Sequence, residues 1–156
     1  MNYSAIIKDD LINGEGARVT LFVSGCSHGC PGCFNEETWD YRVGYKFTDE
    51  VLNELFTAAD KSYISGLSLL GGDPLAPKNA STVIDICKKF KEHFPEKTIW
   101  CWTGYTLEEV KNNHAKEVLE YIDVLVDGKF VESLKDLSLP FRGSSNQQIV
   151  RKGVHF

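Results

Sequence analysis

The chain lacks any long apolar run, and none approaches the roughly 20 residues that a bilayer-spanning helix needs. It also lacks an excess of positive charge, because 22 Asp and Glu outnumber 17 Lys and Arg to give a net charge of -5. General binders of nucleic acid or anionic membranes need a basic face, so we expect neither partner. Residues 1–10 have no signal-peptide apolar stretch. We therefore expect a cytoplasmic protein.

Two phosphate-binding motifs are also missing. The chain contains neither G-x4-G-K-[ST] nor G-x-G-x-x-G, so nucleoside triphosphate or dinucleotide binding is not indicated. Five cysteines are an odd number that fits a disulfide framework poorly, and cytoplasmic thiols stay reduced. No internal repeat or low-complexity linker is visible, and 156 residues is the length of one domain. We expect a single domain over residues 1–156.

Three of the cysteines form the most informative motif. Cys26, Cys30 and Cys33 have the spacing C-x3-C-x2-C on a glycine-rich loop that follows the apolar run Val19–Val23. Thiolates at this density form a soft ligand set that suits an iron–sulfur cluster or zinc. A four-iron cubane held by three thiolates leaves one iron without a protein ligand, and that iron can bind a substrate. The count of three therefore favours an enzyme.

Other functions of this loop stay open. His28 would complete a Cys3His zinc inventory, but it lies only two residues from both Cys26 and Cys30, which makes a shared ion difficult on so short a loop. Cys30-Pro31-Gly32-Cys33 could be a redox dithiol, although Cys26 would then have no role. A simple electron carrier would usually bind its cluster through four cysteines. Cys87 and Cys101 fall in apolar segments, where we expect packing residues.

Strand-like and helix-like segments alternate along the chain. This order predicts an α/β fold with mostly parallel strands, and the length allows only a partial TIM-like barrel, since a full one needs about 250 residues. We expect core strands at Arg18–Val23, Gly66–Leu70, Thr98–Trp102 and Ile122–Val126, an edge strand at Ala5–Ile12 and a last strand at Gln148–Arg151. We expect helices over Asp49–Asp60 with Thr48 as N-cap, from about Asn79 to Phe94, after a Thr106–Glu109 capping box, and over Lys116–Tyr121.

Polar or glycine-rich segments follow each core strand. The cysteine loop follows the first, and the others are Gly71–Pro74, Thr103–Tyr105 and Asp127–Lys129. Parallel α/β folds bind ligands beyond the carboxyl ends of their strands, so we expect one shared site. Gly71 and Gly72 lack a Cβ, which lets the backbone approach a ligand closely.

Several longer strings give a resemblance that covers nearly the whole chain. The sequence resembles the glycyl-radical activases of the radical S-adenosylmethionine (SAM) superfamily, and within them the activases of anaerobic ribonucleoside-triphosphate reductase. The strings are Asn13-Gly14-x-Gly16-x-Arg18, Leu21–Cys26 with the two partner cysteines, Gly71–Leu75, Trp102–Tyr105, Val124–Phe130 and Arg142–Gln147.

The resemblance implies a set of site residues. Three cysteines would hold a 4Fe–4S cluster, whose open iron would take the amino and carboxylate groups of SAM. The metal ligands would be Cys26, Cys30 and Cys33, and the cofactor-binding residues would be Gly32, Cys33, Phe34, Gly71, Gly72, Asp73, Asp127 and Lys129. Within that set, the Gly71–Asp73 backbone would bind the methionyl part and Gly32–Phe34 would face the adenine.

The resemblance also implies a reaction and its partners. An external one-electron reductant would supply the electron that cleaves SAM to methionine and a 5′-deoxyadenosyl radical. That radical would take a hydrogen atom from a glycine Cα on the large chain of the reductase, so no residue is expected to act as a general acid or base. A homodimer is also conceivable on the same resemblance.

Three positions depart from the common patterns of the superfamily. An aromatic residue often precedes the third cysteine, but Gly32 stands there, which makes Phe34 the candidate for contact with the adenine. The acid after the two glycines is often Glu, whereas this chain has Asp73, one methylene shorter. Glu15 replaces the proline of a Gly-Pro-Gly string. None of these departures removes an expected cluster ligand.

Overall fold

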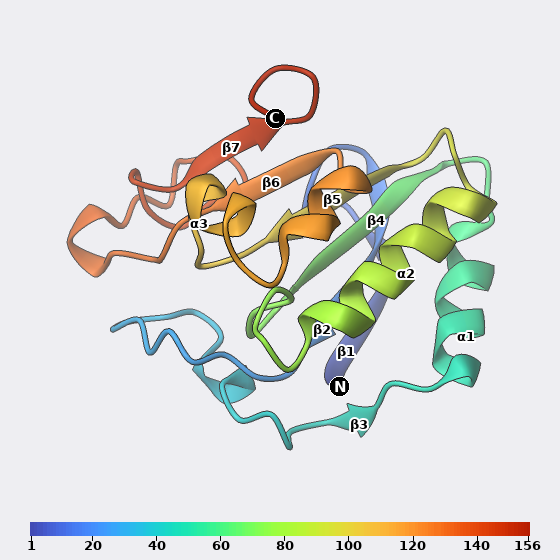
Figure 1. Cartoon of the computed structure of the whole chain (residues 1–156), viewed down its shortest axis with the longest axis horizontal. Coiled ribbons are helices and arrows are strands. Elements are labelled where there is room, and N and C mark those ends of the chain that lie inside the picture. Colours follow the sequence, from blue (N-terminus) through green and yellow to red (C-terminus); the bar gives the residue numbers. More distant parts are fainter.

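A computed structural model describes residues 1–156, which form one seven-stranded sheet with helices along the chain between its strands (Figure 1). The strands are β1 (Asn2–Asp10), β2 (Ala17–Val23), β3 (Tyr45–Lys46), β4 (Ile64–Gly71), β5 (Thr98–Trp102), β6 (Val124–Asp127) and β7 (Gln148–Arg151). The α-helices are α1 (Asp49–Ala59), α2 (Ala80–His93) and α3 (Leu107–Lys111), and the 3₁₀ helices are η1 (Glu36–Thr38), η2 (Lys116–Glu120) and η3 (Glu132–Leu134).

The sheet is mixed and open, with the strand order β3-β1-β2-β4-β5-β6-β7. Its four central strands, β2, β4, β5 and β6, pair in parallel. The flanking pairs β3–β1, β1–β2 and β6–β7 are antiparallel. The prediction of an α/β fold is confirmed, but the prediction of mostly parallel strands holds only for the centre. The antiparallel strands β1 and β7 connect to their neighbours without a helical crossover, so helix–strand alternation could not reveal their direction.

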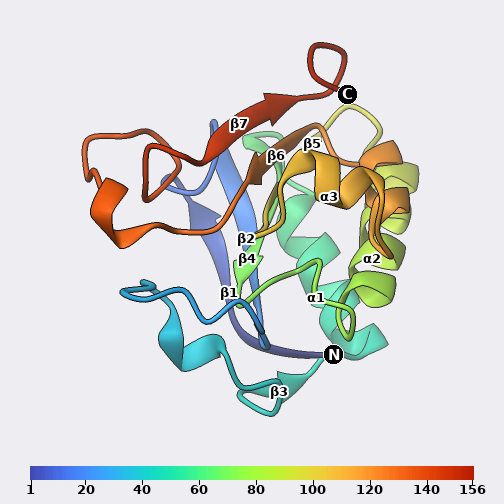
Figure 2. The ribbon, with the colours of Figure 1, turned by 60° about the vertical axis from the view of Figure 1, so that its left-hand side comes forward.

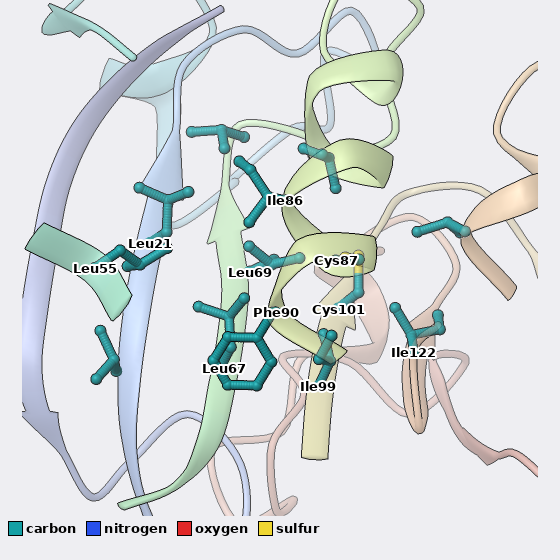
Figure 3. Close-up of a cluster of buried hydrophobic side chains, with 14 of the residues drawn as sticks. Leu21, Leu55, Leu67, Leu69, Ile86, Cys87, Phe90, Ile99, Cys101 and Ile122 are labelled. Atoms are coloured by element: carbon teal, nitrogen blue, oxygen red, sulfur yellow. The ribbon is translucent and has the colours of Figure 1, made fainter. Parts of the chain in front are cut away.

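The main core lies between the central strands and the two long helices (Figure 3). Alternate residues of each strand face the helices, as the two-residue period of a strand requires. Leu67 and Leu69 of β4 lie beside Ile99 and Cys101 of β5, and all four are fully buried. Cys87 on α2 belongs to the same cluster. The prediction that Cys87 and Cys101 are core residues is therefore confirmed.

The opposite face of the sheet carries polar and aromatic side chains. The guanidinium of Arg18, on β2, crosses β4 and β5 and donates to the Ser68 hydroxyl at 2.8 Å and to the Thr98 carbonyl at 2.7 Å. Its charged group also lies 5.9 Å from the ring centroid of Trp100. Burial lowers the pKa of Arg18 to about 10. These contacts give the arginine of the Asn13–Arg18 string a structural role away from the cysteine loop.

The three α-helices gather on one side of the sheet, as Figure 2 shows. The Thr48 hydroxyl accepts from the Val51 N–H at 3.3 Å, and Thr106 and Glu109 form a reciprocal capping box, so both predicted N-termini are confirmed. Asn79 precedes α2 but makes no side-chain cap; its amide donates instead to the Ser24 and Asp73 carbonyls. No helix of the structure is both long and apolar enough to span a membrane.

Candidate functional site

A cavity of about 440 Å³ lies at the carboxyl ends of the four parallel strands. Segments far apart in the sequence form its walls: the cysteine loop after β2, the turns after β4, β5 and β6, and the long segment between β6 and β7. Figures 1 and 2 both place the cysteine loop and this C-terminal segment on the same side of the sheet. The volume is on the scale of pockets that bind one small molecule. The cavity therefore lies at the strand ends, where a shared site was expected.

All three loop cysteines line this cavity. Cys26, Cys30 and Cys33 are each partly exposed, and none forms a disulfide. The Asn35 N–H donates to the Cys33 sulfur at 3.5 Å. The structure does not gather these thiols, or any other three Cys, His, Asp or Glu side chains, into a preformed metal-holding group. The donor set fits an iron–sulfur cluster, and metal binding would have to draw the loop together.

Burial makes two of the loop thiols hard to ionise. It raises the pKa of Cys26 to about 11, and it raises the pKa of Cys30 even though hydrogen bonding at the Phe130 backbone acts in the opposite direction. Both thiols are therefore protonated near neutral pH when no cation is bound. Metal ligation requires thiolates, so a cationic centre binding here would release their protons.

The Gly71–Gly72 turn is far from the cysteines in the sequence, but it lines the same cavity. A Cβ on Gly71 would lie 2.1 Å from the Val23 carbonyl oxygen, and one on Gly72 would lie 2.4 Å from the Gly25 carbonyl oxygen. These glycines therefore let the turn after β4 pack against the start of the cysteine loop. Gly72 lines the cavity, and its carbonyl oxygen accepts no backbone hydrogen bond from the chain.

Asp73 follows this turn, and its carboxylate is 1% exposed. The oxygen Oδ1 accepts from the Leu75 N–H at 2.8 Å and from the Thr103 hydroxyl at 2.9 Å. The oxygen Oδ2 accepts from the Gly104 N–H at 3.0 Å and lies 2.6 Å from Nε2 of His28. The backbone of Asp73 is engaged as well: its N–H donates to the Gly25 carbonyl at 2.8 Å, and its carbonyl accepts from the Ala76 N–H at 3.1 Å and the Asn79 amide at 3.0 Å. Donors and acceptors of the chain itself thus occupy both the carboxylate and the backbone of Asp73.

The other predicted cofactor residues divide into two groups. Phe34 lines the cavity, is 52% exposed, and has its ring centroid 5.1 Å from that of Phe130. Gly32, Asp127 and Lys129 do not line the cavity. The buried Asp127 carboxylate accepts from the Leu107 N–H at 2.8 Å and from the Gln148 N–H at 3.2 Å, so it joins the start of α3 to β7. Contacts of these three residues with SAM stay a prediction.

The string Arg142–Gln147 had no evident role in the sequence, and the structure gives it one. The Gln147 side chain accepts from the Gly143 and Ser144 N–H groups and donates to the Gly128 carbonyl at 2.9 Å. These bonds fasten the C-terminal segment to the turn after β6, where it closes one wall of the cavity. Nε of Arg142, a residue of the same wall, is buried without a hydrogen-bond partner. Only the density of small and amide residues hinted at this folded loop.

His28 is the residue whose role sequence reasoning missed most clearly. It appeared only as an unfavourable zinc ligand, and its Nε2 is directed to Asp73. Its ring also lies edge-on to Tyr105, with the centroids 4.7 Å apart. No spacing rule connects residues 28 and 73, so the pair could not be found from the sequence.

The fold and the cavity define a class: an α/β protein with three thiols at the carboxyl ends of parallel strands. Residues 12–150 match the family described as 4Fe-4S single cluster domain. The chain is also similar to three proteins named anaerobic ribonucleoside-triphosphate reductase-activating protein. It is 47% identical to the one from Enterobacteria phage T4, covering 96% of this chain and 93% of that protein. It is 47% identical to the one from Escherichia coli strain K12 (96% and 97%) and 46% identical to the one from Haemophilus influenzae (97% and 98%).

These similarities far exceed what a shared fold alone requires, and they span nearly the full length of each protein. The chain belongs to the 4Fe-4S single cluster domain family and, within it, to the anaerobic ribonucleoside-triphosphate reductase-activating proteins. The resemblance seen in the sequence is thereby confirmed.

Proposed function

We propose that this chain is a radical SAM enzyme that activates the large chain of anaerobic ribonucleoside-triphosphate reductase by generating a glycyl radical on it. The observation that carries the proposal is the convergence of three cysteines and the Gly71–Gly72 turn on one cavity at the strand ends. The names of the relatives support the choice of target. With an external one-electron reductant, a bound 4Fe–4S cluster and SAM would supply reductive sulfonium cleavage and the 5′-deoxyadenosyl radical that removes hydrogen from glycine.

The cysteine loop would hold the cluster through Cys26, Cys30 and Cys33. The loop has no regular secondary structure between residues 24 and 30, so it can adjust to draw three thiolates together. No fourth cysteine lines the cavity, since Cys87 and Cys101 are fully buried in the core. Three ligands would leave one iron open to SAM, which separates this proposal from a saturated electron carrier.

Polar and aromatic groups on the cavity wall suit the parts of SAM. The Gly72 carbonyl oxygen can accept from the amino group. Arg142 lines the cavity, so its guanidinium is a cationic group near the place where the carboxylate would bind. The exposed ring of Phe34 gives an apolar surface for the adenine. The chain thus binds and orients SAM, and it needs no general acid or base of its own.

The reductase would dock around the mouth of the cavity. A pocket of about 440 Å³ is on the scale of one cofactor, so the glycine of a protein substrate must approach from outside. Ile12 and Leu137 line the cavity and are 78% and 81% exposed, which places two apolar side chains where the partner chain would arrive. Apolar residues this exposed near a functional cavity suit a protein interface.

Three further parts of the proposal follow from the same assignment. Residues 1–156 would act as a single radical SAM domain whose parallel strands form part of a barrel. The protein would work in the cytoplasm, where thiols stay reduced. A homodimer remains compatible with the proposal, but the cavity is complete within one chain.

The test is anaerobic. The protein is loaded with iron and sulfide, mixed with SAM and dithionite, and assayed for 5′-deoxyadenosine. Adding the large reductase chain should then produce a glycyl radical signal in electron paramagnetic resonance (EPR). A loaded cluster that yields no 5′-deoxyadenosine would favour an electron carrier, and colourless protein with one zinc would favour a structural site.

A further inference from the structure

The cysteine loop has few hydrogen bonds to the rest of the molecule. Within residues 27–32, one side-chain bond joins Ser27 to the Tyr41 hydroxyl at 3.0 Å, in an exposed position. A second joins His28 to Asp73 at 2.6 Å, and the Asp73 carboxylate is held from the end of β5. The Cys30 thiol also has a hydrogen bond at the Phe130 backbone. The His28–Asp73 pair is therefore the side-chain contact that joins the middle of the loop to the ends of β4 and β5.

The His28–Asp73 pair is largely buried, and other donors hold the carboxylate in place. The side chain of His28 is 11% exposed and that of Asp73 is 1% exposed, so water competes little for their hydrogen bond. Thr103 and Gly104 donate to the same carboxylate from the end of β5, and the Leu75 N–H donates to it from the turn after β4. A carboxylate fixed by three other donors can orient the imidazole in turn.

The neighbours of His28 fix its ring as well. A Cβ on Gly104 would lie 2.5 Å from Cδ2 of His28, so the ring packs directly on a residue that has no side chain. Tyr105 contacts the ring edge-on from the next position. Residues that follow β5 thus pack against the His28 ring and restrict its orientation.

We infer that His28 and Asp73 are positioning residues that hold the cysteine loop against the ends of β4 and β5. This His28–Asp73 bridge sets where the three thiols lie relative to the Gly72 carbonyl, and therefore where a cluster lies relative to SAM. The inference rests on the proposed function for the identity of the cofactors. The bridge itself is a property of the chain and can be tested without them.

The first test uses metal-free protein and amide hydrogen exchange. His28→Ala removes the bridge, and we expect the Cys26 and Gly104 amides to exchange about 10- to 100-fold faster, the range that corresponds to losing a buried hydrogen bond to a charged group. His28→Gln keeps an N–H donor at a similar reach and should restore most of the protection. Unchanged exchange in His28→Ala, or equal defects in both variants, would overturn the inference.

His114→Gln is the matched control. In the parent chain, Nε2 of His114 lies 2.6 Å from the Leu75 carbonyl oxygen, and the His114 ring lies 5.9 Å from that of Tyr105 between centroids. It lies outside the cysteine loop and does not line the cavity. We expect exchange at Cys26 to be unchanged in this variant. Faster exchange there would mean that any histidine lost near Tyr105 loosens the loop, which would contradict a specific bridge.

The second test uses the loaded protein. At equal iron content, His28→Ala should weaken SAM binding about tenfold and reduce the change that SAM causes in the EPR spectrum of the reduced cluster, since loss of one such hydrogen bond is worth at least that factor. His28→Gln should lie close to the parent. If the parent itself binds no SAM, the proposed function fails while the exchange result still decides the bridge. If the parent binds SAM and His28→Ala binds it equally well, only the bridge fails.

Discussion

Two groups of cysteines in this chain differ in exposure and in the part of the fold where they lie. Cys26, Cys30 and Cys33 are partly exposed, lie on a loop and line a cavity. Cys87 and Cys101 are fully buried between α2 and β5, where burial raises the pKa of Cys87 to about 12 and that of Cys101 well above its ordinary value. A buried thiol without a cation stays neutral and acts as a small apolar side chain. Location, and not residue type, therefore separates the candidate ligands from the packing residues.

Asp73 and Asp127, the two carboxylates at strand ends, also show that location decides the role of a side chain. Asp73 lies shortly after β4 and Asp127 is the last residue of β6, and both were expected to contact SAM. In the structure each is buried and accepts hydrogen bonds from backbone N–H groups of other segments. A buried carboxylate is stable only when such donors surround it. Acidic residues at strand ends can thus use their carboxylates to hold segments of the site together.

The largest expected effect is the loss of a loop cysteine. Cys26→Ala, Cys30→Ala or Cys33→Ala should each abolish cluster retention and SAM cleavage, because two thiolates cannot hold the cubane as three do. Iron and sulfide content and 5′-deoxyadenosine formation measure the effect. Cys87→Ala is the control and should keep both. Cluster loss in Cys87→Ala together with retention in Cys26→Ala would reverse the assignment of the two groups.

Thiol labelling of native metal-free protein compares the groups directly. Iodoacetamide should label the three loop thiols, while Cys87 and Cys101 should react at least about 10³-fold more slowly, because they become accessible only when the protein opens against about 5 kcal/mol or more. Peptide mass spectrometry after timed labelling gives the rates. Labelling of Cys101 at the rate of Cys30 would show that the core is open on that side.

A smaller effect is expected at the mouth of the cavity. Leu137→Asp places a charge on an apolar rim and should lower glycyl radical formation on the reductase about tenfold, the scale of one interface residue. SAM cleavage without the reductase should stay unchanged, because Leu137 is 81% exposed. Val154→Asp is the control, since Val154 is 76% exposed and does not line the cavity. Equal losses in both variants would argue against docking at this rim.

The smallest effect should come from the core thiols. Cys87→Ala leaves a small void beside Cys101 and should lower the free energy of unfolding by about 1 kcal/mol. Urea unfolding of the metal-free protein measures the change. A loss well above this range would mean that Cys87 has a role beyond packing.

Much of the fold could be predicted because the signals are local. Thr48, Thr106 and Glu109 cap helices through bonds that span three residues, and the buried strands are continuous apolar runs. Asn79 shows where such reasoning fails: it has the right type and place for a cap, but its side chain bonds to Ser24 and Asp73 instead. A tertiary partner was more favourable than the local one, and no local signal could show it.

The sequence alone determined the number and spacing of the loop cysteines, the period of the strands and the order of the elements, because each depends on neighbouring residues. The tertiary structure decided which strand-end residues face the cavity and which only support it. His28 and Thr103 reach Asp73 across 45 and 30 residues of chain, respectively. Hydrogen bonds over such separations depend on how the sheet brings its strand ends together, and that arrangement exists only in the folded protein.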